Sequence, residues 1–178
     1  MPPHASDPFA TLGVDARFDL DPKELEARHR ELSRALHPDR HAGATPAQRR
    51  LALSRAIEVN EAYRLLKDPV KRAERVLEAR GAPVGEGQEP KPSGALLMEM
   101  MESREALSEA VSEKDAVRVR ALGSEMRARN QSLLERLREA LATDDDAHRS
   151  AAVALLGEIR YVRRFLDEVA AFEEALAG

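Results

Sequence analysis

The placement of proline constrains the fold of this chain more than any other feature of its sequence. All ten prolines lie at or before Pro92, and the rest of the 178-residue chain has none. Proline disrupts a helix interior but is favoured at the first position of a helix. We therefore expect short helices with sharp starts in the first half and long uninterrupted helices in the second.

The composition favours an all-α fold and excludes several kinds of site. Only 3% of the residues are aromatic, whereas β-sandwiches and barrels depend on aromatic and β-branched side chains. The chain has no Cys, which excludes disulfides, thiolate zinc sites, Cys-ligated iron–sulfur clusters and a Cys nucleophile. The longest apolar run, at 151–156, is too short for a membrane span. The net charge of −4 gives no reason to expect a nucleic-acid partner.

A change in composition predicts two domains. Four Gly and three Pro lie between Gly81 and Gly94, which is typical of a linker. The start of the chain has neither the basic nor the apolar region of a secretory signal, so we expect a cytoplasmic location. The expected divisions are a disordered segment at 1–6, a domain at 7–80, a linker at 81–94 and a second domain at 95–178.

Helix-start and helix-stop signals give the expected elements. In the first domain, a capping residue followed by Pro predicts helices at Asp21–Leu36, Thr45–Lys67 and Asp68–Gly81, with a short turn of helix at Pro8–Leu12. In the second domain, apolar periodicity predicts helices at Gly94–Glu113, Asp115–Leu141 and Asp145–Leu176. Short connections between these three favour an antiparallel three-helix bundle.

The first long helix has an apolar edge and an opposite basic edge. At 100° per residue, Leu25, Leu32 and Leu36 fall within about 40° of one another. The basic edge consists of Lys23, Arg30 and Arg34. It is followed directly by His37-Pro38-Asp39, in which Pro38 restricts the backbone between two polar side chains. This arrangement suits an acidic partner surface, although a solvated face with a Glu26–Arg30 pair followed by a turn would look the same.

At this point the sequence resembles the J domain of DnaJ-type co-chaperones. The residues that carry the resemblance are Asp7-Pro8-Phe9, Leu12-Gly13, Leu32, Leu36, His37-Pro38-Asp39, Asn60-Glu61-Ala62-Tyr63, Leu66-Lys67-Asp68-Pro69 and Arg72-Ala73. The resemblance implies a helical hairpin whose His37-Pro38-Asp39 loop and basic helix, through Lys23, Arg30 and Arg34, bind a DnaK-type chaperone and stimulate its ATP hydrolysis. Many J domains have Lys-Phe after the tripeptide, where this chain has Arg40-His41.

The helix after the linker has more apolar surface than one buried face requires. Met100 and Leu107 belong to a core stripe, whereas Leu97, Met98 and Met101 extend the apolar arc over the first two turns only. This second patch could be buried against the first domain or the third helix. It could equally be an exposed docking face, since Met adapts to many partners.

Together with Glu102, Arg104 and Glu105, this patch resembles the C-terminal domain of the HscB family, which serves iron–sulfur cluster assembly. Arg164-Phe165-Leu166-Asp167 resembles the same family, and Phe165 could either cap the patch or close the bundle. The resemblance implies that this domain binds the cluster scaffold IscU, delivering it to a DnaK/HscA-type chaperone. The absence of Cys resembles the bacterial type. The implied scaffold contacts are Leu97, Met98, Met101, Glu102, Arg104, Glu105 and Phe165.

Other constellations predict little chemistry. His37 and His41 straddle a proline and have no evident third ligand, so no metal is expected. No nucleophile elbow or phosphate loop is present, and we expect neither an enzyme nor a bound cofactor. Asp144–Asp146 is expected to cap a helix. Two other functions stay open: a J-protein for a different client, and a structural helical protein in which the tripeptide is incidental.

Overall fold

The computed structural model describes residues 7–41, 43–82, 85 and 90–177. Over these residues every regular element is a helix, and the chain divides into two compact units, Met1–Gly81 and Ala82–Gly178. The all-α prediction is therefore confirmed. The expected disordered segment at 1–6 and residues 83–84 and 86–89 of the expected linker lie outside the described residues. No described helix is long and apolar enough to cross a membrane.

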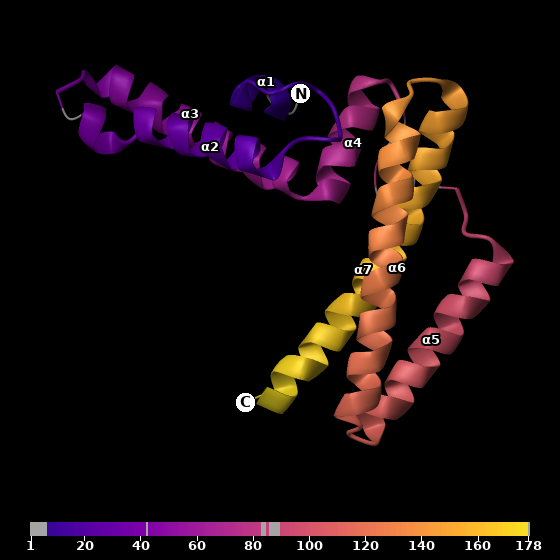
Figure 1. Cartoon of the computed structure of the whole chain (residues 1–178). Coiled ribbons are helices and arrows are strands. Elements are labelled where there is room, and N and C mark those ends of the chain that lie inside the picture. Colours follow the sequence, from indigo (N-terminus) through magenta and orange to yellow (C-terminus); the bar gives the residue numbers. More distant parts are fainter. Residues whose placement is uncertain (1–6, 42, 83–84, 86–89, 178) are drawn as a thin grey trace. The chain divides into compact units, whose positions relative to one another are not determined.

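The first unit is built on a pair of helices joined at a narrow tip. Its elements are α1 (Pro8–Leu12), α2 (Pro22–Ala35), the 3₁₀ helix η1 (Pro38–His41), α3 (Pro46–Lys67) and α4 (Pro69–Ala79). Helices α2 and α3 run side by side in opposite directions, and α1 lies against both (Figure 1). Phe9, Leu12 and Leu66 fill the space between them and are at most 2% exposed.

A capping side chain and a proline begin each α-helix of this unit. Asp7, Asp21, Thr45 and Asp68 each accept a hydrogen bond from a backbone N–H of the first turn, and each is followed by Pro. Thr45 forms a complete capping box with Gln48. Since caps of this kind satisfy N–H groups that have no partner within the helix, the sequence signals locate the helix starts to within a residue.

Two residues of the expected apolar edge are less buried than the pattern predicts. Leu25 is 3% exposed, but Leu32 and Leu36 are only half-buried. The short helix α1 lies toward the α4 end of the hairpin, so near the tip α2 and α3 pack on each other without it (Figure 1). Two helices cannot enclose the side chains between them as fully as three do.

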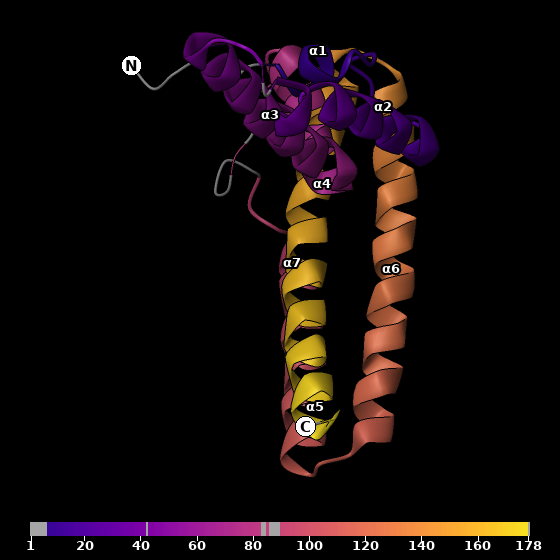
Figure 2. The same ribbon diagram turned by 90° about the vertical axis from the view of Figure 1, so that its left-hand side faces the viewer.

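The second unit consists of three helices that pack as expected. They are α5 (Gly94–Ser112), α6 (Ala116–Ala142) and α7 (Asp146–Ala177), and α6 lies antiparallel to α7 (Figures 1 and 2). Leu137, Leu156 and Ile159 are at most 1% exposed between them. The acidic run before α7 caps it, since Asp145 accepts the backbone N–H of His148 at 2.8 Å. That hydrogen bond lowers the pKa of Asp145.

The close approach of α6 and α7 depends on Gly123. A Cβ atom at this position would lie 2.9 Å from Cγ1 of Val169 and 3.3 Å from the guanidinium of Arg127. Val169 is β-branched and 1% exposed, so it cannot move aside without disturbing the core.

Gly123→Ala is expected to destabilise the protein by about 1 kcal/mol, measured by chemical unfolding. Overpacking a core costs about 1–3 kcal/mol, which exceeds the gain of about 1 kcal/mol from replacing Gly by Ala within a helix. Gly94→Ala is the control, because a Cβ there meets nothing within 4 Å. A Gly123→Ala variant as stable as the Gly94→Ala variant would contradict this account of the interface.

Candidate functional site

The His37-Pro38-Asp39 loop forms a turn at the tip of the first unit. Helix α2 ends at Ala35, and the tripeptide runs into the 3₁₀ helix η1. The backbone N–H of Asp39 donates to Nδ1 of His37 at 3.3 Å, and Oδ2 of Asp39 lies 3.5 Å from the same nitrogen. The His37 side chain is 58% exposed and that of Asp39 is 90% exposed. Both groups are therefore held near each other and available to a partner.

A hydrogen bond from His41 connects this loop to the end of α2. Nε2 of His41 donates to the carbonyl oxygen of Ala35 at 3.2 Å, and the backbone N–H of Arg40 donates to the carbonyl of His37 at 3.0 Å. Many J domains have an aromatic ring at the position of His41. Here a half-buried imidazole occupies that position and adds a hydrogen bond across the end of the helix.

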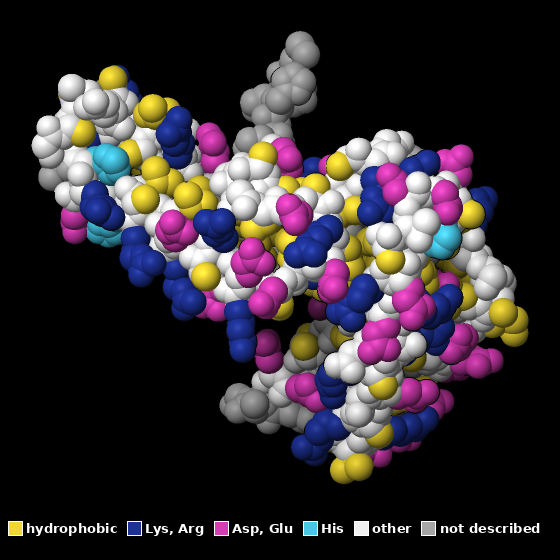
Figure 3. Space-filling model, turned by 45° about the horizontal axis from the view of Figure 1, so that its top comes forward, with side chains coloured by type: hydrophobic (Ala, Val, Ile, Leu, Met, Phe, Trp, Pro, Cys, Tyr) yellow, Lys and Arg dark blue, Asp and Glu magenta, His cyan; other side chains and the backbone are white. Residues whose placement is uncertain are grey.

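The basic edge of α2 is exposed, as the helical pattern predicts. Lys23, Arg30 and Arg34 all lie on the surface, and the Glu26–Arg30 pair named for the alternative of a solvated face forms at 3.2 Å. Pairs as exposed as this one contribute little to stability. In Figure 3, Lys and Arg side chains follow one another along the lower edge of the first unit. The arrangement provides positive charge beside the tripeptide loop.

A stacked pair that the sequence analysis missed braces α2 against α3. The ring of His29 stacks on Tyr63 with centroids 4.1 Å apart, and its Nε2 donates to Oδ1 of Asn60 at 2.9 Å. Asn60 and Tyr63 belong to a motif that carries the resemblance, but periodicity on α2 alone gives His29 no partner. The contact helps to hold the helix that bears the basic edge.

The second candidate site is the outer face of α5. Leu97 is 41% exposed, Met98 64% and Met101 70%, whereas Met100, which belongs to the core stripe, is 7% exposed. We call Leu97, Met98 and Met101 the apolar face of α5. Of the alternatives for this patch, burial against α7 is therefore wrong, because all three side chains are exposed.

Charged residues surround this face, but Phe165 does not belong to it. Glu102, Arg104 and Glu105 are exposed, and Arg104 donates to Oε1 of Glu168 on α7 at 2.7 Å. Phe165 is 1% exposed and lies within the bundle core. Of the two expected alternatives, Phe165 therefore closes the bundle. It can support the site only from the bundle core.

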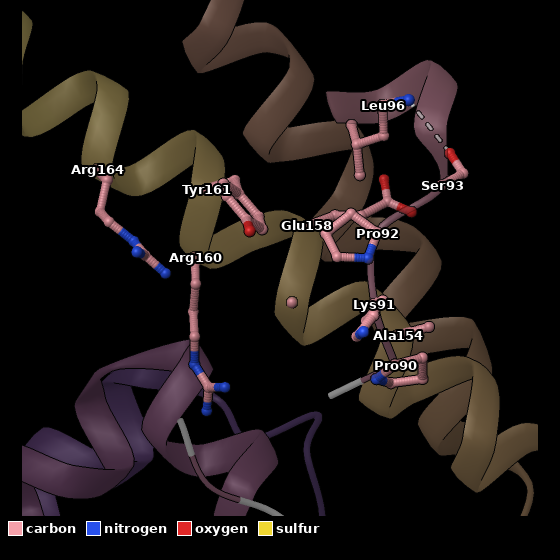
Figure 4. A pocket seen from close by; sticks show the side chains of 11 residues that line it. Pro90, Lys91, Pro92, Ser93, Leu96, Ala154, Glu158, Arg160, Tyr161 and Arg164 are labelled. Atoms are coloured by element: carbon pink, nitrogen blue, oxygen red, sulfur yellow. Dashed lines mark hydrogen bonds between the residues drawn. The ribbon is translucent and has the colours of Figure 1, made fainter. Parts of the chain in front are cut away.

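A pocket of about 470 Å³ lies beside the segment that leads into α5 (Figure 4). Pro92 lines it on one side, with Tyr161, Arg160 and Arg164 of α7 on the other. No expected scaffold contact lines this pocket, so it is separate from the apolar face. The described residues contain no cluster of His, Asp or Glu that could hold a metal ion.

The chain matches two protein families in succession. Residues 7–74 match the DnaJ domain, and residues 93–170 match the HSCB C-terminal oligomerisation domain. The first match covers the tripeptide loop and the basic edge. The second covers the whole apolar face of α5 and most of α7.

Curated relatives and solved structures are similar over nearly the full chain. A co-chaperone protein HscB homolog of Burkholderia multivorans is 37% identical over 168 residues, which is 94% of each chain. The Pseudoalteromonas atlantica homolog is 34% identical, covering 95% of this chain and 97% of its own. The chaperone HscB from Vibrio cholerae has a TM-score of 0.81 at 29% identity, covering 96% and 99%. Human co-chaperone HscB, at 23% identity, shares the fold with a TM-score of 0.83, covering 97% and 84%.

Proposed function

Because the chain belongs to the HscB family of J-domain co-chaperones, we propose that it delivers an IscU-type scaffold to a DnaK/HscA-type chaperone during iron–sulfur cluster assembly and transfer. Its J domain implies an Hsp70-type partner, and proteins of this family are not enzymes. The observation that carries the proposal is the presence on one chain of an exposed tripeptide loop and an exposed apolar face on α5. We place this activity in the cytoplasm.

We assign contact with the chaperone to His37, Pro38 and Asp39 together with Lys23, Arg30 and Arg34. Exposed cations accelerate association with an acidic surface and orient the encounter, without needing to contribute much affinity. The turn at Pro38 presents the imidazole and the carboxylate together. ATP is bound and hydrolysed by the partner, and the role of this chain is to stabilise the partner's hydrolytic conformation.

We assign contact with the scaffold to the apolar face of α5 and its charged rim. Exposed apolar side chains at the centre of an interface, surrounded by polar residues, are typical of binding hot spots. The two methionines can adapt to an irregular partner surface. The charged rim consists of Glu102, Arg104 and Glu105 and disfavours partners whose charges do not complement it, with Phe165 supporting the site from the core.

Another copy of this chain is a second candidate partner for the apolar face. The matching family is described as an oligomerisation domain, and Leu97, Met98 and Met101 are all exposed in the single chain. Self-association through this face would compete with scaffold binding. Sedimentation at increasing protein concentration distinguishes the two, since only self-association makes the apparent mass rise.

His37→Gln is expected to abolish stimulation of the chaperone's ATPase while leaving the thermal unfolding temperature unchanged. The side chain is mostly exposed, so its replacement removes the presented imidazole without disturbing a core. The measurement is steady-state ATP hydrolysis by a purified DnaK/HscA-type chaperone. His148→Gln is the matched control, because it makes the same replacement outside the J domain, at the start of α7. Normal stimulation by the His37→Gln protein would contradict the assignment.

The triple variant Leu97→Ala, Met98→Ala, Met101→Ala is expected to bind purified IscU at least about 30-fold more weakly by calorimetric titration. Truncating one hot-spot side chain costs about 2 kcal/mol or more, which corresponds to that factor. Because all three side chains are exposed, the variant stays folded. Full retention of affinity would assign the scaffold to another surface, and no binding by the wild type would leave a J-protein of a different client.

A further inference from the structure

The half of α5 that carries the apolar face has little apolar packing of its own. The buried residues of this helix are Met100, Leu107 and Ala110, and only Met100 lies in the first two turns. The neighbouring helix α6 buries seven residues along its length. One buried side chain cannot by itself fix the rotation of a helix about its axis. Other contacts must therefore orient the first turns of α5.

Two ion pairs connect this part of α5 to its neighbours. Glu99 accepts hydrogen bonds from both terminal nitrogens of Arg129 on α6, the longer of them 3.1 Å. Arg104 donates to Glu168 on α7 at 2.7 Å. The Arg129 side chain is only 25% exposed, and its hydrogen bond lowers the pKa of Glu99. Both pairs join residues far apart in the sequence.

The two pairs lie on opposite flanks of α5. At 100° per residue, Glu99 and Arg104 are about 140° apart, with Met100 between them. Met101 lies outside this arc, about 60° beyond Arg104. One pair holds the helix toward α6 and the other holds it toward α7. With both in place, the apolar face is directed away from the bundle.

We infer that Arg129 and Glu168 are positioning residues of the scaffold-binding face, which they act on through Glu99 and Arg104. This inference rests on the proposed function for the identity of the ligand. Neither Arg129 nor Glu168 belongs to the expected scaffold contacts, and each acts by holding α5. The Glu99 and Glu168 carboxylates are about half exposed, so removing either pair is expected to cost the bundle little stability and to change mainly the orientation of α5.

Loss of the Glu99–Arg129 pair and loss of the Arg104–Glu168 pair are expected to rotate α5 in opposite directions. Without Arg129, α5 is held only through Arg104, so the helix turns toward α7 and moves Met101 inward. Without Glu168, α5 is held only through Glu99, so it turns toward α6. Met100, about 100° from Glu99, then moves outward. General loosening of the bundle would instead expose all of its buried methionines together.

Methionine oxidation measures this rotation without any partner. The full-length protein is exposed to dilute peroxide, and the oxidation rates of Met100, Met101 and Met126 are followed by peptide mass spectrometry. Met126 on α6 is 4% exposed and reports on general loosening. In Arg129→Gln, the Met101 rate is expected to fall at least about twofold, and in Glu168→Gln the Met100 rate is expected to rise at least about twofold, with Met126 unchanged.

Exchanging the charges of Glu99 and Arg129 tests whether a reversed ion pair restores the oxidation pattern. The double variant Glu99→Arg with Arg129→Glu reverses the α5–α6 pair and is expected to restore the wild-type oxidation pattern, whereas either single reversal disturbs it. Arg136→Gln is the control for loss of a positive charge, because Arg136 lies exposed on the same helix. Unchanged patterns in both Gln variants, or a common rise of all three rates, would overturn the inference.

The affinity for IscU provides a second measurement of the same effect. Arg129→Gln and Glu168→Gln are each expected to weaken IscU binding about twofold to fivefold, because a smaller fraction of molecules presents the face correctly. Wild-type affinity in both variants would overturn the inference. If the oxidation patterns shift as expected but the wild type does not bind IscU, the positioning role holds and the proposed function fails.

Discussion

A capping side chain followed by proline determines where each α-helix of the J domain begins. Asp21-Pro22 and Thr45-Pro46 fix the starts of α2 and α3, and Pro38 begins the 3₁₀ turn between them. Since the capped ends satisfy backbone groups that would otherwise need water, the hairpin has a defined tip. The exposed imidazole and carboxylate at that tip lie directly after the basic edge of α2. The surface assigned to the chaperone therefore depends on the same local rules that form the hairpin.

The helices of the bundle are also capped but begin without proline, and their arrangement depends on side-chain packing. Most of the bundle core lies between α6 and α7, whose close approach Gly123 allows. Helix α5 contributes only three buried residues to this core. Its first turns are thus free to present an apolar surface. A helix that was packed as fully as α6 could not direct Leu97, Met98 and Met101 outward.

Local features of this protein could be predicted from sequence, whereas contacts between distant segments could not. Helix bounds, the basic edge and the apolar face of α5 follow from caps and periodicity, which act within a few residues. The burial of Phe165 depends on how α7 is rotated against its neighbours, which periodicity places only within a broad arc. The His29–Tyr63 stack and the Arg104–Glu168 pair join residues 34 and 64 positions apart, and neither helix alone indicates its partner.

The proposed function requires the two sites to act together, because one chain that carries both would raise the local concentration of scaffold at the chaperone. The direct test measures scaffold-dependent ATP hydrolysis by the chaperone with wild type and with an equimolar mixture of two full-length variants. One variant, His37→Gln, keeps the scaffold face, and the other, with Leu97, Met98 and Met101 replaced by Ala, keeps the J domain. The account predicts that the mixture fails to reproduce the wild-type rate at limiting concentration. A mixture as active as the wild type would contradict it.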